Sequence, residues 1–369
     1  MKIDNKQMIR CLELAKQGIG NVAPNPMVGC VIVYQNKIIA VGYHEKYGEA
    51  HAEVNAINAV MDKSVLKEST LYVNLEPCAH SGKTPPCADL IIKHQIPNVV
   101  VGCIDTYAEV AGKGIEKLRA AGISVTVGVL EEKAKELNKR FFTFHNKKRP
   151  FIILKWAETK DGFIDVERNV IANIEERNMK QSSQTKDCFV PRNDEKVDNW
   201  ITSSFSKKLV HQWRSEEQAI MIGTNTALND NPKLTVREVE GKNPLRVVLD
   251  LNLRLPEQLN VFDSSTPTLV FNSVKSEIKH KLEFVKIDKN NDLIPQILNE
   301  LYQRNIQSII IEGGTQLLQT FIDANCWDEA KVFIGNKTFT KGLKAPLIDK
   351  QPNATLQFDT DILNTYNNA

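Results

Sequence analysis

The feature of this sequence that most constrains its fold is a set of one histidine and two cysteines between positions 51 and 87. His51 opens a helical pattern, Cys78 follows a short apolar run and Pro77, and Cys87 follows two prolines at the start of another helical pattern. One imidazole and two thiolates can be the three protein ligands of a tetrahedral Zn²⁺ whose fourth position is left to water. The chain must then bring these side chains together across a predicted strand and a proline-rich loop.

A carboxylate, Glu53, lies two residues after this histidine, as in the His-x-Glu and Pro-Cys signature of zinc deaminases that act on nucleobases. Zn²⁺ lowers the pKa of a bound water to about 7. Glu53 can take the proton of that water and pass it to a departing amine, so the pattern predicts hydrolytic loss of ammonia from an amino-substituted heterocycle. One detail differs from the usual signature, because eight residues separate Cys78 from Cys87 where two are common.

A structural zinc site is the alternative for these ligands, because structural sites prefer a fourth protein ligand. His44 and His80 are the available candidates for that fourth ligand. A single histidine on an amphipathic helix would by itself indicate no metal. Three potential ligands in this order, with a carboxylate beside them, favour the catalytic interpretation.

Length and composition limit the class of protein. The 369 residues and the hydrophobic content of 42% are enough for more than one core, so we expect two domains. The net charge of +2 argues against a dedicated nucleic-acid-binding protein. We expect a soluble, cytoplasmic chain without membrane association, because no signal peptide or bilayer-spanning run is evident. The seven dispersed cysteines favour reduced thiols or metal ligands over a disulfide framework.

Hydrophobic periodicity predicts that the first 130 residues form one sheet covered by helices on both faces. Two apolar runs on either side of Gln35-Asn36 predict a β-hairpin at the start of this sheet. The expected helices are 7–17, 51–61, the segment that follows Cys87, and 114–121, and the expected strands are 28–33, 38–41, 71–75, 98–102 and 123–129.

The segment 137–150 mixes basic and aromatic side chains and ends in a proline, and we place the domain boundary there, with domains 1–147 and 148–369. Its composition fits a linker helix with a packed aromatic face or a nucleic-acid-binding patch. Beyond it, strands alternate with helices and predict a second α/β domain. The expected strands are 151–155, 219–223, 245–250, 268–271, 308–311 and 332–334, and the expected helices are 204–214, 292–304 and 315–323. The polar stretch between Val166 and Asp198 predicts a long surface insertion.

The segment 309–315 predicts a strand, a glycine turn and a helix start, where backbone N–H groups can receive a phosphate. Plain turn chemistry is the alternative for Gly313-Gly314, because the dinucleotide-binding fingerprint is absent. Arg214 and Arg237 can clamp a phosphate bidentately, although isolated arginines are usually solvated.

The first half also holds a group of short motifs with a recognisable order. They are Asn25-Pro26, Val28-Gly29-Cys30, Gly42-Tyr43-His44, the stretch 48–53, and the stretch 75–87 with its long loop between the cysteines. Together they resemble the N-terminal half of the bifunctional riboflavin-biosynthesis deaminase/reductases. The resemblance implies a cytidine-deaminase-like three-layer α/β/α domain, in which His51, Cys78 and Cys87 bind zinc and Glu53 is the catalytic proton shuttle. It also implies that Asn25 faces the ring of a diamino-pyrimidinone that carries a ribosylamino 5′-phosphate.

A second group of motifs extends the resemblance to the reductase half of that family. They include Lys155 with Thr159, Asp161 and Gly162, the stretches 200–203, 223–226, 230–232, 234–237 and 312–315, and Arg214. This half implies a dihydrofolate-reductase-like α/β domain that uses NADPH to reduce the ribosyl group to a ribityl chain. The implied nucleotide contacts are Ala157, Trp200, Thr202, Thr226, Asp230, Gly314 and Thr315. The implied substrate contacts are Lys155, Arg214, Leu234, Arg237 and Glu312, with the arginines nearest the phosphate.

The leading hypothesis is a two-step enzyme that uses Zn²⁺ and NADPH on a small phosphorylated pyrimidine, and we expect it to be a homo-oligomer. One alternative is a nucleic-acid-editing zinc deaminase with an appended binding domain. Another is a sensor that binds zinc and a nucleotide without turnover. Two departures from the family pattern concern the second half: the insertion after Val166 is longer than usual, and Asp198 stands where a small hydroxyl residue often contacts substrate.

Overall fold

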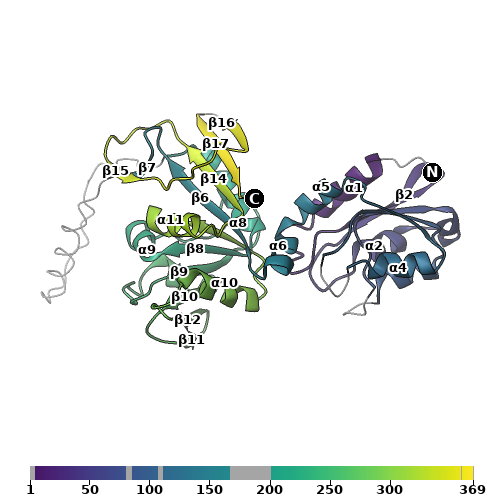
Figure 1. Cartoon of the computed structure of the whole chain (residues 1–369), viewed down its shortest axis with the longest axis horizontal. Helices are drawn as coiled ribbons and strands as arrows, with labels where there is room; N and C mark the ends of the chain where they lie inside the picture. Colours follow the sequence, from purple (N-terminus) through teal and green to yellow (C-terminus); the bar gives the residue numbers. More distant parts are fainter. Residues whose placement is uncertain (1–4, 80–84, 107–110, 167–200, 359, 369) are drawn as a thin grey trace, which may run out of the picture.

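The computed structural model describes residues 5–79, 85–106, 111–166, 201–358 and 360–368. These residues form two α/β domains, and helix α6 lies between them (Figure 1). The predicted sheets and helices of both halves are present, and the mixed α/β architecture is confirmed. His80, Asp198 and Trp200 lie outside the described residues, and so does most of the segment predicted to be a surface insertion.

The N-terminal domain is built on one five-stranded sheet with strand order β2-β1-β3-β4-β5. Strand β1 pairs antiparallel with β2 and β3, whereas β3, β4 and β5 are parallel. Its elements are α1 (Asn5–Lys16), β1 (Gly29–Tyr34), β2 (Lys37–Tyr43), α2 (Ala52–Ala59), the 3-10 helix η1 (Lys63–Glu68), β3 (Thr70–Leu75), α3 (Cys87–Lys93), β4 (Asn98–Cys103), α4 (Lys113–Ala120), β5 (Ser124–Val127), α5 (Glu131–Leu137) and α6 (Lys139–Lys147).

Helices cover both faces of this sheet because its strands bury side chains in both directions. On one face, Ile32, Val73 and Val101 pack with side chains of α2, α3 and α4. On the other face, Val31, Tyr72 and Val100 pack with side chains of α1. The resulting three layers match the α/β/α arrangement expected for this half of the chain.

The C-terminal domain has a ten-stranded sheet with order β11-β12-β10-β9-β8-β13-β6-β14-β17-β16, and a two-stranded sheet of β15 and β7. Its central strands, from β10 through β14, are parallel. Its elements are β6 (Phe151–Glu158), β7 (Phe163–Val166), α8 (Ser204–Glu216), β8 (Ala219–Gly223), α9 (Thr224–Asp230), β9 (Leu245–Leu249), the 3-10 helix η2 (Asn260–Phe262), β10 (Thr268–Asn272), β11 (Glu277–Lys279), β12 (Leu282–Lys286), α10 (Leu293–Gln303), β13 (Ser308–Glu312), α11 (Thr315–Asp323), β14 (Glu329–Ile334), β15 (Gly342–Lys344), β16 (Ala354–Phe358) and β17 (Asp361–Asn367).

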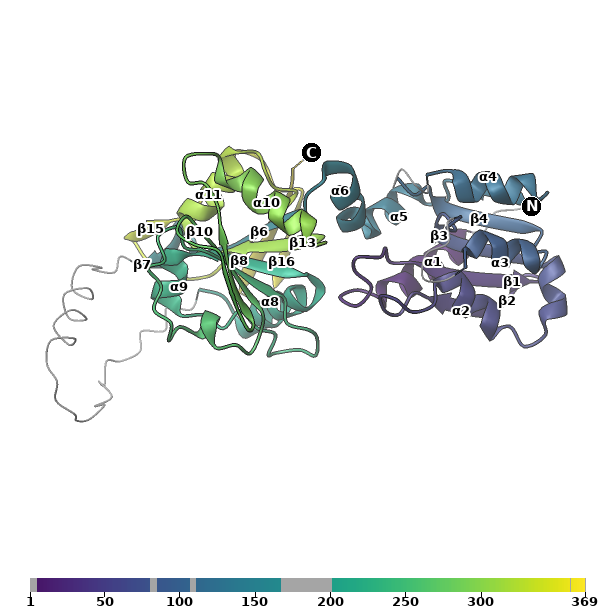
Figure 2. The same cartoon turned by 90° about the horizontal axis from the view of Figure 1, so that it is seen from below.

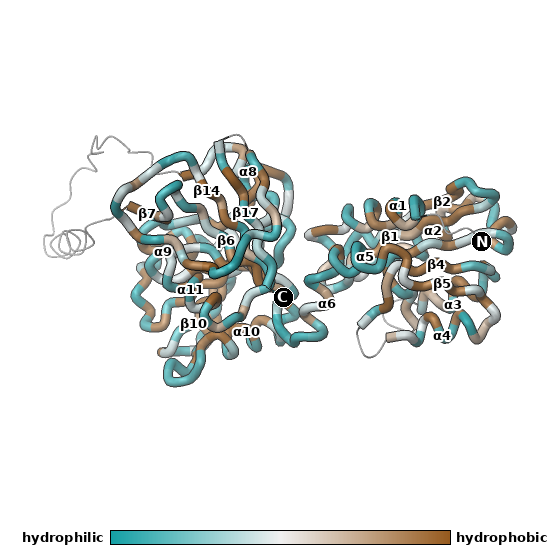
Figure 3. The backbone as a smooth tube through the Cα atoms, turned by 45° about the horizontal axis from the view of Figure 1, so that its top comes forward, coloured by the Kyte–Doolittle hydropathy of each residue, from teal (hydrophilic) through white to brown (hydrophobic). Residues whose placement is uncertain are grey.

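Two clusters of apolar side chains hold this larger sheet between helices. Helices α10 and α11 cover one face and α8 and α9 the other (Figure 2). The central strands form the brown, hydrophobic interior of the domain (Figure 3). Because the strands are parallel, their carboxyl ends meet at one edge of the sheet, where open α/β proteins place ligands.

Several helices and strands of the second domain were not predicted from the sequence. They are the short helix α9 and the peripheral strands β7, β11, β12, β15, β16 and β17. The peripheral strands are short or half-exposed, so they lack the continuous apolar runs that identify buried strands. In the described part of the chain, no helix is both long enough and apolar enough to cross a membrane.

The basic and aromatic segment between the domains has a structural role. Lys139 pairs with Glu329 at 2.7 Å, and Arg140 makes a bidentate pair with the buried carboxylate of Glu217. Burial alone would raise the pKa of Glu217, but the neighbouring Arg140 holds it below its usual value. The basic side chains of this segment therefore face carboxylates of the reductase-like domain, which does not favour the nucleic-acid interpretation.

A second ion-pair group lies at the end of the same segment. Asp328 accepts hydrogen bonds from Lys147 and Arg149 and also from the backbone N–H of Ile152. The aromatic side chains Phe141 and Phe142 are buried in the N-terminal domain. The segment thus packs one face against each domain, as expected for the linker helix.

Candidate functional site

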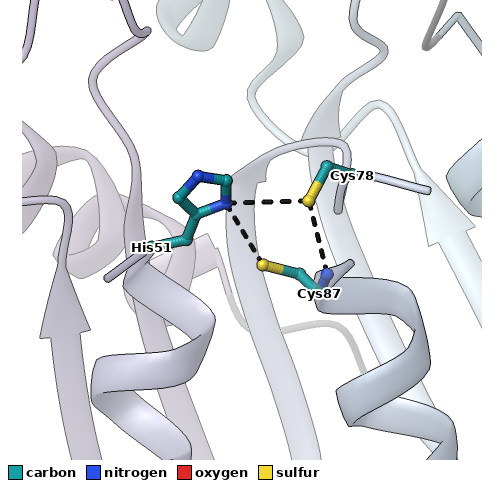
Figure 4. A group of neighbouring side chains, drawn as sticks. All are labelled: His51, Cys78 and Cys87. Carbon is teal, nitrogen blue, oxygen red and sulfur yellow. Dashed lines mark hydrogen bonds between the residues drawn. The ribbon is translucent and has the colours of Figure 1, made fainter. Parts of the chain in front are cut away.

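The three predicted metal ligands converge at the ends of two helices and a strand. The Nδ1 atom of His51 lies 3.6 Å from Sγ of Cys78 and 3.3 Å from Sγ of Cys87 (Figure 4). In a tetrahedral zinc site, a nitrogen ligand and a sulfur ligand lie about 3.5 Å apart, given the usual bond lengths. The three side chains therefore fit Zn²⁺ with Nδ1 as the ligating atom of His51.

Local structure explains how the chain presents these ligands. His51 caps helix α2 and Cys87 is the first residue of α3, while Cys78 follows β3. The backbone N–H of Cys87 donates to Sγ of Cys78 at 3.3 Å, and this contact at a helix N-terminus favours a thiolate. The hydrogen bonds from Cys87 and His51 hold the pKa of Cys78 well below its usual value.

Helix α2 can approach the sheet closely because of Gly42 on β2. A Cβ at that position would lie 2.4 Å from the backbone N of Ala56 and 2.6 Å from the carbonyl O of Ala52. Both atoms belong to the helix backbone and cannot move aside independently. Gly42 therefore sets the depth at which His51 and the carboxylate beside it are held.

The structure favours a site with an open coordination position. Among the described residues, only His51, Cys78 and Cys87 form a cluster of possible metal ligands. His44, a candidate fourth ligand, uses both ring nitrogens elsewhere: Nε2 lies 3.1 Å from Nδ2 of Asn25, and Nδ1 lies 3.0 Å from the carbonyl O of Ala50. Because Nδ2 of Asn25 can only donate and the carbonyl O of Ala50 can only accept, Nε2 of His44 is the acceptor in this arrangement and Nδ1 carries the proton.

Glu53 is the buried acid of this site. It is the second residue of α2 and its side chain is only 3% exposed. Burial, with a further contribution from the Cys78 thiolate, raises the pKa of Glu53 to about 7, and the carboxyl group contacts the Cys87 thiol. A carboxyl group with this pKa can both accept and release a proton at neutral pH.

Asn25 lies on the same side of the N-terminal domain as the metal ligands. Its amide contacts His44, whose ring centroid is 5.5 Å from that of His51. Asn25 follows Pro24 in the loop between α1 and β1. The structure thus brings all five predicted deaminase residues, Asn25, His51, Glu53, Cys78 and Cys87, into one region.

A second charged cluster lies in the C-terminal domain. Lys155 on β6 is in register with Glu312 on the neighbouring strand β13. Arg214 on α8 donates from Nη2 to Oε2 of Glu312 at 2.9 Å. Burial would raise the pKa of Glu312, but Arg214 and Lys155 hold it below its usual value. Burial also lowers the pKa of Lys155.

This cluster has unmet hydrogen-bonding capacity. Nε of Arg214 and Oε1 of Glu312 are buried and have no hydrogen-bond partner within the described part of the chain. Buried polar atoms are seldom left unpaired, so these two atoms mark the cluster as a place where a polar ligand fits.

The other two predicted substrate residues lie on the loop after α9. Leu234 is buried in the core and has a positive φ of 54°. Arg237 donates from Nη1 to Thr235 at 2.9 Å, and its backbone N–H donates to Nδ1 of His211 at 3.1 Å. The sequence analysis missed His211, although it lies three residues before Arg214 on the same helix and so on the same face.

A cavity of about 310 Å³ lies at the carboxyl ends of β8 and β9, beside the start of α11. Of the predicted nucleotide contacts, Thr226 and Gly314 line it, and the backbone N–H of Gly314 donates to Oγ1 of Thr226 at 2.8 Å. Ala157, Thr202, Asp230 and Thr315 do not line this cavity. Its lining also includes residues that were not predicted to contact the nucleotide, among them Thr224, Asn225, Asp250 and Arg254.

Comparison with known proteins covers both halves of the chain. Residues 1–103 match the family model described as cytidine and deoxycytidylate deaminase zinc-binding region. Residues 150–367 match the model described as RibD C-terminal domain. The second match alone spans more than half of the chain.

Individual relatives match this chain over most of its length. The chain is 40% identical to the riboflavin biosynthesis protein RibD of Aquifex aeolicus, over 93% of this chain and 89% of the relative. It is 38% identical to RibD of Bacillus amyloliquefaciens, over 87% and 81%. Among solved structures, it resembles a diaminohydroxyphosphoribosylaminopyrimidine deaminase/5-amino-6-(5-phosphoribosylamino)uracil reductase of Thermotoga maritima, with a TM-score of 0.83, 37% identity, and coverage of 99% and 98%.

Proposed function

The chain belongs to the RibD family of bifunctional riboflavin-biosynthesis enzymes, which join a zinc-dependent deaminase to an NADPH-dependent reductase, and from this premise we propose a role for each described site residue. The first site deaminates the diaminohydroxyphosphoribosylaminopyrimidine named for the Thermotoga relative. The second site reduces the deaminated product. The convergence of His51, Cys78 and Cys87 beside the buried Glu53 is the observation that carries this proposal.

In the first site, His51, Cys78 and Cys87 would hold the zinc ion, which when bound lowers the pKa of a water to about 7. Glu53 accepts a proton from the attacking water and delivers it to the ring amine. A carbon–oxygen bond forms, the carbon–nitrogen bond breaks, and ammonia leaves. Asn25 donates or accepts hydrogen bonds at the edge of the pyrimidine ring. The Glu53 pKa of about 7 suits both proton transfers.

In the second site, Lys155, Arg214 and Glu312 bind the sugar phosphate of the deaminated product, together with Arg237 and the backbone near Leu234. The buried, unpaired atoms Nε of Arg214 and Oε1 of Glu312 support this role, because a polyhydroxylated phosphate supplies both an acceptor and donors. NADPH supplies the hydride when bound. Opening of the sugar ring leaves C1′ double-bonded to the amine nitrogen, and Lys155 would orient this group so that C1′ accepts the hydride while the nitrogen takes a proton.

The cavity beside Thr226 and Gly314 holds part of the NADPH molecule. The start of α11 lies beside this cavity, and a helix N-terminus suits a pyrophosphate. Arg254 is the only basic residue in its lining and is exposed at its edge. We assign to Arg254 the recognition of the 2′-phosphate that distinguishes NADPH from NADH. Ala157, Thr202, Asp230 and Thr315 contact other parts of the nucleotide, and the same role is proposed for Trp200.

Three further expectations belong to the proposal. The division between a deaminase domain of residues 1–147 and a reductase domain of residues 148–369 is supported by the end of α6 at Lys147 and the start of β6 at Phe151. A cytoplasmic location and a homo-oligomeric state complete it. Sedimentation velocity of the purified chain tests the oligomeric state.

A coupled assay tests the function. Purified protein loaded with zinc is incubated with the diamino-pyrimidinone phosphate, and NADPH is then added. We expect ammonia release in the first stage and NADPH oxidation in the second. Glu53→Gln should lower the rate of deamination by about 10²- to 10⁴-fold, since the amide cannot carry the proton, and should leave reduction of the pre-deaminated substrate intact. Absence of ammonia release from zinc-loaded protein would contradict the proposed function and favour a sensor.

A further inference from the structure

One side chain of the reductase domain reaches the substrate loop of the deaminase domain. Gln307 directly precedes β13, is only 3% exposed, and donates from Nε2 to the carbonyl O of Pro24 at 2.7 Å. Pro24 lies in the loop between α1 and β1 and is followed by Asn25. A partly buried hydrogen bond therefore links the start of a central reductase strand to the residue beside a predicted pyrimidine contact.

The position of the donor is fixed by the reductase sheet. The backbone N–H of Gln307 donates to Oε1 of Gln218 at 2.6 Å, and its carbonyl O accepts from the N–H of Phe151 at 2.8 Å. Strand β13, which follows, is buried along its whole length. Any displacement of the Gln307 backbone would therefore disturb the centre of the reductase sheet.

The loop that receives this hydrogen bond is also held on either side. At Gly20, φ is +74°, and an added Cβ would lie 2.6 Å from the carbonyl O of Ser215, so the loop backbone packs directly on the end of α8. At Met27, the side chain of Asn138 accepts from the backbone N–H at 2.8 Å and donates to the carbonyl O at 3.0 Å. Between these two points, Gln307 makes the hydrogen bond that holds the carbonyl next to Asn25.

A short chain of contacts leads from this point to the metal ligands. Asn25 donates to His44, and His44 donates to the carbonyl O of Ala50, which directly precedes His51. The peptide that joins Pro24 to Asn25 is held at both polar atoms: the Pro24 carbonyl O accepts from Gln307, and the Asn25 N–H donates to the carbonyl O of Val22 at 2.9 Å. We expect that loss of the Gln307 hydrogen bond lets this peptide rotate and misaligns the Asn25 amide. The metal ligands lie on α2, on α3 and after β3, and none of them belongs to this loop.

We propose that Gln307 of the reductase domain is a positioning residue for deamination, because its hydrogen bond to Pro24 holds Asn25 in place against the pyrimidine ring. The inference rests on the proposed role of Asn25. It means that the deaminase site is completed by the neighbouring domain, so that ring binding depends on a side chain from the other half of the chain. The effect should appear in the KM of deamination, since Gln307 touches neither zinc nor Glu53.

The test measures both activities of full-length, zinc-loaded variants. Gln307→Met removes the donor while keeping the length of the side chain, and Gln303→Met, at an exposed position of α10, is the matched control. We expect Gln307→Met to raise the deamination KM by about 5- to 10-fold, the equivalent of one lost hydrogen bond, with kcat changed less than about twofold. Zinc content and the kcat/KM for reduction of the pre-deaminated substrate should match the control.

Two results would overturn the inference. One is an unchanged deamination KM in Gln307→Met. The other is an equal loss of deamination and reduction, which would indicate only that the reductase sheet had been disturbed. Gln307→Ala, which removes the same donor without adding bulk, replaces the first variant if that one does not fold. Asn25→Ala distinguishes the role of Gln307 from that of Asn25. A raised KM in Asn25→Ala but not in Gln307→Met rejects the positioning role of Gln307 alone, whereas no effect in either variant also rejects the proposed role of Asn25.

Discussion

Arg214 and Glu312 face each other as a buried ion pair, with 2.9 Å between Nη2 and Oε2, although both had been predicted to hold substrate. The pair leaves Nε of Arg214 and Oε1 of Glu312 without partners in the part of the chain that is described. Each residue can therefore fix the other and still offer one atom to a ligand. The ion pair and the substrate contact are compatible roles.

Loss of the charge on Glu312 should impair reduction strongly. Glu312→Gln removes the carboxylate partner of Arg214, and removing one partner of a largely buried pair costs about 3–5 kcal/mol. We expect the kcat/KM for reduction to fall by at least about 100-fold, with a lower melting temperature and with deamination intact. Steady-state kinetics of both steps check this, with the exposed Glu257→Gln as control. Normal reduction by Glu312→Gln would exclude a role for this cluster in binding.

Removal of the metal should separate the two activities. Dialysis against a chelator is expected to abolish deamination and leave NADPH oxidation with pre-deaminated substrate unchanged, because the cysteine ligands lie only in the first domain. Added zinc should restore ammonia release. Cys87→Ala should lose zinc, as measured by atomic absorption, whereas Cys326→Ala, at a half-buried cysteine of the second domain, should keep it. Retained deamination in metal-free protein would exclude the zinc mechanism.

Arg254 should determine the choice between the two nicotinamide cofactors. Arg254→Ala removes the one basic side chain in the cavity lining. We expect the KM for NADPH to rise by about 10-fold, since hydrogen bonds to a charged group contribute about 1.5–3 kcal/mol, and the KM for NADH to change little. The exposed Lys242→Ala is the control for a general change in surface charge. Equal effects on both cofactors would place the 2′-phosphate elsewhere.

His211 should make the reductase domain sensitive to acid. Burial, aided by Arg214, Arg237 and Lys207 and opposed by Glu238, lowers its pKa to about 4. The unfolded chain binds a proton at this residue below about pH 6.5, whereas the folded chain does not until about pH 4. The free energy of unfolding should therefore fall as the pH is lowered through this window, by up to about 1.4 kcal/mol per pH unit.

The variant His211→Asn isolates this contribution. Its amide oxygen can replace Nδ1 as the acceptor for the backbone N–H of Arg237, and it does not titrate. Urea unfolding between about pH 4 and 7 should then show a weaker pH dependence than the wild-type chain, with reduction retained at pH 7. Identical slopes for the two proteins would contradict the shifted pKa.

The residues of the candidate metal site could be predicted from local sequence. His51 and Glu53 lie on one helix start, and Cys78 and Cys87 lie next to prolines that end a strand and precede a helix. The secondary-structure position of each of these residues depends on its neighbours in sequence. Motif and periodicity were therefore enough to select all four residues. The distances between them were not predictable, because they depend on the depth at which Gly42 lets α2 pack on the sheet.

The contacts in the reductase domain, by contrast, could not be predicted from local sequence. The resemblance selected Thr226 and Gly314 separately, but their hydrogen bond exists because β13 is inserted between β8 and β6. His211 and Arg254 carried no sequence motif. They were identified from their spatial neighbours. His211 accepts a hydrogen bond from the backbone N–H of Arg237, and Arg254 lines the nucleotide cavity.

The sequence by itself determined the two α/β domains and the family, and it selected the candidate zinc ligands and the carboxylate beside them, because these depend on hydrophobic periodicity and on short motifs. Only the tertiary structure decided the pairing of Arg214 with Glu312 and the contact of Gln307 with Pro24. Such contacts join strands and loops that are distant along the chain. Their geometry follows from strand order and from the packing of one domain on the other, which no local pattern of residues encodes.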